Sequence, residues 1–391
     1  MVKSFQFGSL PVIYFQAGKL KSLPEIIMNY GRSVILVTGK DSFNLSPKSE
    51  FLLNAFETNG IKCYRVTISG EPGPGMIDEA VNKFRDIKID SVVGIGGGSV
   101  LDAGKAISAM MYKKNSVRIY LEGIGVSEHP GTKLPYITIP TTSGTGSEAT
   151  KNAVLSETGI NGFKKSLRHD RLIPDVALID PELTLNCPPE ITAASGMDCF
   201  TQLTEAFLSS KANQYTDALA LKGLKSIKSS LLPAYQDGGN LDARSGMSFA
   251  ALTSGICLAN AGLGLVHGFA SSIGGMYTIP HGLICGTLMA VTNEINVRIL
   301  RKDKTNPEAL AKYSMIGQLF SAKEGKSLDY YIDEFIRYLL ELTKELHLPG
   351  LGKSGLTERD LQKIAESTDE KNNPVTLSAE EKFELLKSRF V

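Results

Sequence analysis

The sequence contains little cysteine, little histidine and no tryptophan. Its 391 residues include five cysteines and five histidines. The cysteines are scattered along the chain, at positions 63, 187, 199, 257 and 285, and no two of them form a C-x-x-C pair. This spacing argues against a disulfide framework and favours free thiols, which are typical of a reducing compartment. We therefore expect a cytoplasmic protein.

An excess of charge of one sign is also missing, because 42 Lys and Arg residues stand against 41 Asp and Glu. Binding to nucleic acid or to an anionic membrane requires a concentrated basic face, so neither partner is expected. No membrane helix, which needs roughly 20 predominantly apolar residues, is expected. The N-terminal residues 1–15 lack the apolar run of a signal peptide. These absences together predict a soluble protein.

The chain does contain two halves of different periodicity, and its length favours two domains over one. Up to residue 180, short β-branched runs alternate with amphipathic segments. Strands are expected at 33–38, 64–68, 91–95, 136–139 and 176–179, with helices at 75–86 and 99–111. Strands that are apolar on both faces and separated by helices indicate a mostly parallel sheet covered on both sides.

Beyond residues 180–183 the pattern changes, and no convincing strand follows. Helices are expected near 191–208, 212–232, 242–260, 282–299, 307–320, 326–345 and 377–390. The sequence therefore predicts an α/β dinucleotide-binding domain with a Rossmann-like parallel sheet over 1–183. An all-α domain over 184–391 would follow it, with the ligand cleft between the two.

A glycine-rich segment, GIGGGSVLDAGK at 94–105, follows the expected strand at 91–95 and opens a helix. Gly96, Gly97 and Gly98 would let backbone N–H groups approach a pyrophosphate, and the helix N-terminus adds a positive dipole. The standard G-x-G-x-x-G fingerprint is absent, because Ser99 stands where its last glycine would be. We predict that these glycines and Ser99 bind phosphate. Two interpretations of Asp102, in the first turns of the helix, stay open. It contacts the cofactor, or it is an ordinary acidic residue near a helix N-terminus.

A second polar loop, IPTTSGTGSE at 139–148, leaves the expected strand at 136–139. By itself, this loop is equally consistent with a polar turn that caps a helix. Because it lies at the same carboxyl edge of the sheet as the first loop, it is a candidate for the other wall of a dinucleotide site. The candidate cofactor contacts in it are Thr141, Thr142, Ser143 and Thr145.

The helical half carries candidate metal ligands. Asp198 and Gln202 are four residues apart and share one face of the expected helix. His267 and His281 lie in one short, glycine-rich, apolar segment. One aspartate and two histidines are a plausible ligand set for a divalent cation, although each histidine could instead cap or pack a helix. Cys285 lies four residues after His281, but a buried helical cysteine is usually a packing residue.

With these residues in view, the chain resembles the iron-containing (group III) alcohol dehydrogenase family nearly end to end. The segments that carry the resemblance are GGGSVLDAGK at 96–105, PTTSGTGSE at 140–148, DPEL at 180–183, GMD at 196–198, His267 and PHG at 280–282. The resemblance implies a dehydroquinate synthase-like architecture, an NAD(P)-dependent oxidoreductase activity on a small alcohol and its aldehyde or ketone, and a homodimer or larger assembly. It also implies one divalent metal ion, Fe²⁺ or Zn²⁺, held by Asp198, His267 and His281 with Gln202, the first three being the catalytic set. Asn152 and Lys164 match family positions near the ribose.

The chain departs from the family pattern at two positions. Gln202 stands where a histidine is common, and Ser271 stands where another histidine is common four residues after His267. The first change replaces an imidazole with a weaker amide oxygen, so we expect lower iron affinity and a harder or more weakly held metal. The second removes a candidate proton relay, and the general acid is then not identified.

The choice of dinucleotide is expected to depend on the turn after the strand at 33–38. An acidic residue there would pair with the ribose 2′-hydroxyl of NAD and repel a 2′-phosphate. Gly39 occupies the position that is often Asp in NAD-using relatives, and Lys40 follows it with a positive charge. These two residues favour NADP over NAD. If the match to those relatives were shifted by two residues, Asp41 would occupy the acidic position and would favour NAD.

The sequence disfavours two alternatives to the dehydrogenase. A lyase of the dehydroquinate synthase type would need basic residues around the metal, yet 257–286 contains no Lys or Arg. A metal-free or non-catalytic family member is disfavoured because His267 and His281 are both kept. Apolar residues in that segment lean toward short aliphatic alcohols or aldehydes as substrates; they are Leu263, Leu265, Phe269, Ile273 and Met276.

Overall fold

The computed structural model describes residues 4–159 and 162–390. The chain forms two compact units. One comprises Gly8–Glu157 and Lys164–Asn186 and contains a six-stranded sheet. The other comprises Met1–Phe7, Thr158–Phe163 and Cys187–Val391 and is built of helices. The α/β half followed by a helical half is the predicted fold class, which is thereby confirmed.

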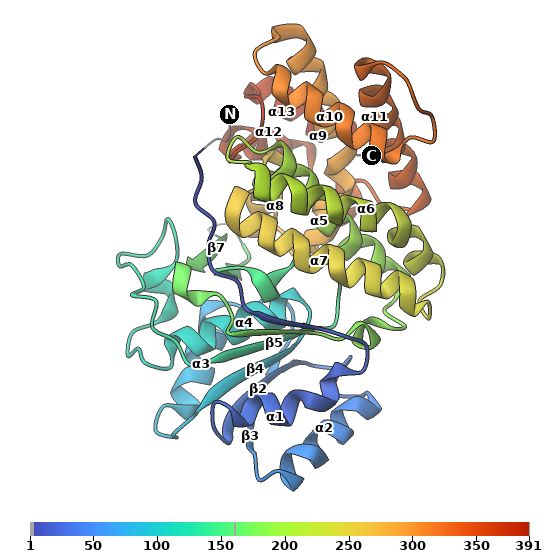
Figure 1. Cartoon of the computed structure of the whole chain (residues 1–391). Coiled ribbons are helices and arrows are strands. Elements are labelled where there is room, and N and C mark those ends of the chain that lie inside the picture. The colour runs from blue at the N-terminus through green and yellow to red at the C-terminus, as the bar shows by residue number, and fades with distance from the viewer. Residues whose placement is uncertain (1–3, 160–161, 391) are drawn as a thin grey trace. The chain divides into compact units, whose positions relative to one another are not determined.

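The sheet of the first unit has the strand order β1-β8-β5-β4-β2-β3, and every neighbouring pair is parallel. Figure 1 shows β2, β4 and β5 side by side. The strands are β1 (Val12–Phe15), β2 (Ser33–Gly39), β3 (Lys62–Ile68), β4 (Ser91–Gly96), β5 (Tyr136–Pro140) and β8 (Val176–Ile179). The five expected strands are confirmed, and β1 was not expected. A small second sheet consists of β6 (Asn152–Glu157) and β7 (Phe163–Arg168).

One face of the large sheet is covered by α1 (Leu23–Met28) and α2 (Pro47–Thr58). Val93 and Ile95 of β4 point to this side and join a buried apolar cluster with Leu52 of α2. Side chains alternate between faces along a strand, so Val92 and Gly94 belong to the opposite side. Burial on both faces explains why these strands read as continuous apolar runs.

The opposite face is covered by α4 (Gly98–Met110), with α3 (Pro74–Phe84) packed beside it. Tyr136 of β5 fills the space here, and its hydroxyl donates to the carbonyl of Leu101 at 2.7 Å. A Cβ at Gly94 or Gly104 would collide with the Tyr136 ring or hydroxyl. The two glycines therefore let the tyrosine fit between strand and helix, which fixes where α4 begins relative to β4.

The helical unit contains α5 to α13, and no strand occurs in the described residues after Ile179. The helices are α5 (Pro189–Leu208), α6 (Gln214–Gln236), α7 (Leu241–Ala261), α8 (Leu265–Met276), α9 (His281–Asp303), α10 (Pro307–Phe320), α11 (Leu328–Glu345), α12 (Glu358–Ser367) and α13 (Ala379–Ser388). The seven expected helices are present, whereas α8 and α12 were not expected. Helix α5 is buried along most of its length and packs against α6, α7 and α9.

Helix α9 is the one described helix that is long and apolar enough on its own to cross a membrane. Its most apolar 18-residue window is 83% buried inside the protein, as expected for the core helix of a globular domain. Helices α7 and α8 would pass the same test only as a pair, and they are bent by 96° at the break between them. The apolar character of these helices is therefore explained by packing inside the helical unit.

Candidate active site

Three helices of the helical unit bring the candidate metal ligands together. Asp198 lies on α5, His267 near the start of α8, and His281 at the first position of α9. Pro280 precedes His281 and adopts a non-helical conformation, so α9 begins at the histidine. The helix boundary is therefore consistent with the prediction that a break in the chain before α9 exposes the imidazole ring of His281.

Glycines on α9 allow the close packing that brings the ligands together. A Cβ at Gly282 would collide with the carbonyl of Ala194 on α5. A Cβ at Gly286 would lie 2.9 Å from the Cβ of Met197, next to Asp198. Larger residues at these positions would push α9 away from α5. The glycines thus set the distance between Asp198 and His281.

The donor atoms form a compact group. Oδ1 of Asp198 lies 3.2 Å from Nε2 of His267 and 3.7 Å from Nε2 of His281. Sγ of Cys285 lies 3.7 Å from each of the same two nitrogens. One donor atom from each of these four residues lies within 4.8 Å of every other. A carboxylate oxygen, two imidazole nitrogens and a sulfur in one largely buried cluster fit a divalent transition-metal ion.

Electrostatics at Asp198 favour its charged form. Burial opposes ionisation, but the imidazoles of His281 and His267 and the amide of Gln202 outweigh it and lower the pKa of Asp198 to about 2. The carboxylate is 1% exposed. A buried, fully ionised carboxylate beside two imidazoles is ready to accept a cation at neutral pH.

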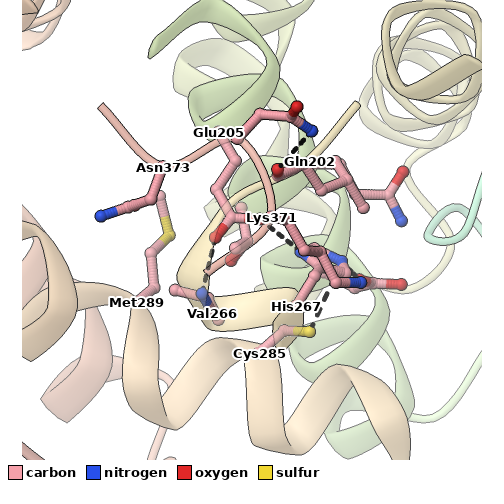
Figure 2. A network of polar contacts seen from close by, with 12 residues as sticks. Gln202, Glu205, Val266, His267, Cys285, Met289, Lys371 and Asn373 are labelled. Carbon is pink, nitrogen blue, oxygen red and sulfur yellow. Dashed lines mark hydrogen bonds and ion pairs between the residues drawn. The ribbon is translucent and has the colours of Figure 1, made fainter. Parts of the chain in front are cut away.

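Glu205 holds His267 in place, and sequence analysis missed it. Oε2 of Glu205 lies 2.6 Å from Nδ1 of His267, and Oε1 accepts the backbone N–H of Val266 at 2.7 Å. Figure 2 shows the glutamate reaching both partners. Glu205 accepts the Nδ1 proton, so Nε2, which faces Asp198 at 3.2 Å, is the nitrogen that can bind an ion once its own proton has left. Because Glu205 comes seven residues after Asp198, two helical turns on the same face, its spacing was a usable signal.

Gln202 is also buried beside Asp198, one turn further along α5. Its Oε1 accepts a hydrogen bond from the hydroxyl of Ser254 at 3.0 Å. Its side chain hydrogen-bonds to Asp198 and helps to lower the pKa of that carboxyl. A carboxylate only accepts hydrogen bonds, so the amide nitrogen must be the group that faces it.

At Ser271, where the resemblance implied a histidine, the hydroxyl donates to the carbonyl of His267 at 2.8 Å. Nζ of Lys371 lies 3.5 Å from the same hydroxyl. Figure 2 places Lys371 in the same network as His267. Lys371 comes from a loop 100 residues away, so no sequence spacing could have linked it to Ser271. Leu265, Phe269 and Ile273 are fully buried in the core formed by α8 and α9, so packing accounts for their apolar character.

In the α/β unit, the two expected cofactor loops lie against each other. The backbone N–H of Thr141 donates to the carbonyl of Gly96 at 3.0 Å. A Cβ at Gly97 would lie 3.2 Å from Oγ1 of Thr142, and one at Gly98 would lie 2.6 Å from Cγ2 of Thr145. Gly97 is the N-cap of α4, and Ser99 follows in its first turn. The structure thus brings the glycines and threonines together at the carboxyl edge of β4 and β5, with the buried Ser143 in the same loop.

Asp102 points inward from α4 and bonds to its own unit. Its carboxylate accepts hydrogen bonds from the hydroxyl of Ser147 and the backbone N–H of Val154. Burial raises its pKa, and Lys105 opposes that rise. Both carboxylate oxygens are therefore used to hold the segment that follows the second loop.

Lys105 has a similar role that the sequence did not indicate. Its buried ammonium donates to the carbonyls of Ser147 and Asn152 and to the hydroxyl of Thr150, at 2.8–2.9 Å. Burial lowers the pKa of Lys105 to about 8, although the negative charges of Asp102 and Glu148 oppose this. These acceptors lie at least 42 residues along the chain, which is why the contact was not predicted.

The remaining candidates lie around this edge of the sheet. Gly39 ends β2, and a Cβ there would make ordinary contact with Val100 of α4 at 3.7 Å. Lys40 follows it and is exposed. Lys164 on β7 forms an ion pair with Glu71 at 2.9 Å. Oδ1 of Asn152 is buried and has no hydrogen-bond partner among the described residues.

Comparison with known proteins identifies the family of the chain. The iron-containing alcohol dehydrogenase model matches residues 11–181, and the C-terminal model of the same family matches residues 192–390. The chain is 30% identical over 390 residues to alcohol dehydrogenase 4 of Saccharomyces cerevisiae, covering 97% of each chain. It is 29% identical to the NAD-dependent methanol dehydrogenase of Bacillus methanolicus, over 81% of this chain and 82% of that one.

A solved structure supports the same assignment. The alcohol dehydrogenase from Oenococcus oeni superposes with a TM-score of 0.88 at 29% identity, covering 99% of this chain and 100% of the other. Members of the family use NAD(P) and a divalent metal ion. The chain belongs to the iron-containing alcohol dehydrogenase family and is an NAD(P)-dependent oxidoreductase that interconverts a small alcohol and its aldehyde or ketone.

Proposed function

We propose that Asp198, His267 and His281 hold the divalent ion of this dehydrogenase, and that loops 96–99 and 141–145 hold the dinucleotide. The observation that carries the first assignment is the buried group of donor atoms within 4.8 Å of one another. The contact between the two loops supports the second. The bound ion supplies Lewis acidity toward the substrate oxygen, and the nicotinamide ring supplies the hydride acceptor.

In this proposal, the protein's own residues bind and orient the ion and the dinucleotide. Glu205 keeps the proton on Nδ1 of His267, so that Nε2 faces the ion. Gly96, Gly97 and Gly98 expose backbone donors at the start of α4 to the pyrophosphate. The unpartnered Oδ1 of Asn152 supports a ribose contact there. Asp102 and Lys105 fix the segment that carries Asn152.

The preferred dinucleotide in this proposal is NADP. Gly39 ends β2 next to the N-terminal turn of α4, and a side chain there would make only an ordinary contact with Val100. Lys40 offers a positive charge to a 2′-phosphate, and neither residue offers a carboxylate to a 2′-hydroxyl. A single charge-assisted contact of this kind is worth roughly 1–3 kcal/mol.

Short aliphatic alcohols are the proposed substrates. The segment 257–286, which carries both histidines, contains no Lys or Arg of its own, and this supports an uncharged substrate even though Lys371 reaches Ser271 from a distant loop. The names of two relatives, NAD-dependent methanol dehydrogenase and 1-propanol dehydrogenase PduQ, support the same class. The test is kcat/KM with each dinucleotide for a series from ethanol to hexanol, with glycerol and a phosphorylated polyol for comparison. Higher kcat/KM for the polyols than for the alcohols would contradict this assignment.

A homodimer or larger assembly in the cytoplasm completes the proposal. Edge strand β1 pairs with β8 on one side and exposes Val12, Ile13 and Phe15. An exposed apolar edge strand is a suitable surface for a second copy of the chain. The five cysteines are all free, which supports a reducing compartment. Sedimentation equilibrium measures the assembly directly, and a monomer at micromolar concentration would contradict it.

A further inference from the structure

The fourth member of the metal-ligand group is a cysteine. Cys285 lies one turn after His281 on α9, so both side chains lie on one face of the helix. Its Sγ is buried and lies 3.7 Å from Nε2 of His267 and 3.7 Å from Nε2 of His281. Figure 2 shows the thiol facing His267. The sulfur is therefore aimed at the same point as the two imidazoles.

The spacing of these atoms fits a four-coordinate ion. Metal–nitrogen and metal–oxygen distances of about 2.0–2.1 Å, with a metal–sulfur distance of about 2.3 Å, give tetrahedral N···O edges of about 3.3 Å and N···S edges of about 3.6 Å. The two N···O separations are 3.2 and 3.7 Å, and both N···S separations are 3.7 Å. The other two separations, N···N and O···S, are no more than 4.8 Å, so some closing of the group would bring all four atoms onto one ion.

Gln202 was expected to be a metal ligand because of its position, but its side chain makes other contacts. Its oxygen accepts from Ser254, and its amide nitrogen faces the Asp198 carboxylate. An amide nitrogen bearing two hydrogens offers no lone pair to a metal. The side chain holds Asp198 in position instead.

We propose that Cys285 is the fourth protein ligand, as a thiolate, in an Asp198–His267–His281–Cys285 site. This inference rests on the proposed function, because it assigns the ligands of the same ion, and the substrate oxygen would then be a fifth ligand. The thiol proton passes to solvent when the sulfur binds. A thiolate in place of an imidazole favours a softer ion, so the site selects Zn²⁺ over Fe²⁺ more strongly than an Asp–His₃ site would. The softness of sulfur thus reverses the expectation of a harder metal that Gln202 suggested.

The test is the absorption spectrum of the full-length protein loaded with one equivalent of Co²⁺. A cobalt–thiolate bond produces an intense charge-transfer band in the near ultraviolet, which oxygen and nitrogen ligands do not. Wild type is expected to show the band, and Cys285→Ser is expected to lose it and to bind Zn²⁺ at least roughly tenfold more weakly. Cys257→Ser is the matched control, because Cys257 is buried outside the group with its sulfur near the carbonyl of Thr216. Gln202→Leu is expected to keep the band.

Three results would overturn the inference: wild type that fails to bind Co²⁺, wild type that binds it without the band, or a band that survives in Cys285→Ser. Loss of metal in Gln202→Leu, with unchanged affinity in Cys285→Ser, would assign the fourth position to Gln202. Failure of the proposed function is distinguishable, because it would leave the band present while no alcohol is oxidised. In the double variant Cys285→Ser with Gln202→His, an imidazole returns to the family position, and relative affinity for Fe²⁺ is expected to rise.

Discussion

Nδ1 of His267 lies 2.6 Å from the carboxylate of Glu205, and both side chains are buried in the helical unit. In the proposed site the glutamate would therefore act on the metal through the histidine. It fixes which ring nitrogen carries the proton, the orientation of the ring and the basicity of Nε2.

Glu205→Gln is expected to weaken metal binding by roughly 10- to 100-fold, because the amide is a poorer acceptor for the Nδ1 proton. Competition with a chromophoric chelator measures this affinity. Glu190→Gln, an exposed glutamate in the first turn of the same helix, is the control. Unchanged affinity in Glu205→Gln would mean that the glutamate only supports the fold.

Gly97→Ala is expected to lower dinucleotide affinity at least roughly tenfold, about 1.4 kcal/mol, because a methyl group would enter the space reserved for the pyrophosphate. Its Cβ would lie 3.2 Å from Oγ1 of Thr142, a contact that a small shift can relieve, so the fold should be kept. Gly98→Val is a harsher change, since even its Cβ would lie 2.6 Å from Thr145.

Fluorescence of bound reduced dinucleotide measures the affinity of the Gly97 variant. Gly75→Ala serves as the control, because nothing lies within 4 Å of a Cβ there. Equal binding by the Gly97 and Gly75 variants would show that the loop does not hold the cofactor.

Gly39→Asp is expected to shift the preference from NADP toward NAD by about tenfold or more, which corresponds to about 1.4 kcal/mol. The added Cβ makes only an ordinary contact with Val100, so the aspartate should fit. The kcat/KM ratio for the two dinucleotides measures the change. A wild type that already prefers NAD tenfold, or a variant with an unchanged ratio, would show that this turn does not read the 2′ position.

His129 predicts a pH dependence of stability in the α/β unit. Its Nδ1 accepts from the backbone of Gly131 and its Nε2 contacts the carbonyl of Ala109, so the folded protein needs the neutral ring. Burial lowers the pKa of His129 from 6.5 to about 4. Between these values the unfolded state binds the extra proton, so the free energy of unfolding falls as pH decreases from about 6.5 to about 4.

The predicted loss across that window is about 3 kcal/mol, and it should be smaller in His129→Gln. Denaturant titrations followed by far-ultraviolet circular dichroism measure it, since the chain has no tryptophan to report. His347→Asn, which changes an exposed histidine of the helical unit, should keep the wild-type slope. Parallel slopes in wild type and His129→Gln would contradict the prediction.

The parts of the fold that were predictable are those whose signal is local. Strands such as 91–95 are apolar because both faces are buried, and the three successive glycines after that strand mark the loop directly in the sequence. Strand β1 was not predicted because it is only four residues long and mostly exposed. Its partner β8 begins at Val176, far away in the sequence, so no local pattern links the two strands. Helix α8 was missed because Gly268, Gly274 and Gly275 lower its helix propensity.

The candidate site was also predictable only where the signal is local in the sequence. Asp198, His267 and His281 were selected by residue type and neighbouring glycines, and the structure brings them together. The importance of Cys285 could not be read from its single helical position, because only packing of α9 on α5 and α8 places its sulfur near both imidazoles. Lys105 and Lys371 make their contacts through the tertiary fold alone.

The most direct test of the account is metal-dependent reduction of dinucleotide by an alcohol. Protein stripped by a chelator is mixed with NADP⁺ or NAD⁺ and 1-propanol, and nicotinamide absorbance is followed before and after one equivalent of Zn²⁺ or Fe²⁺ is added. We predict no turnover in the stripped protein, recovery on adding metal, and at least roughly a hundredfold lower kcat in Asp198→Ala and in His281→Ala, with bound metal reduced in both. Full activity in the stripped protein, or in either variant without bound metal, would contradict the proposed site.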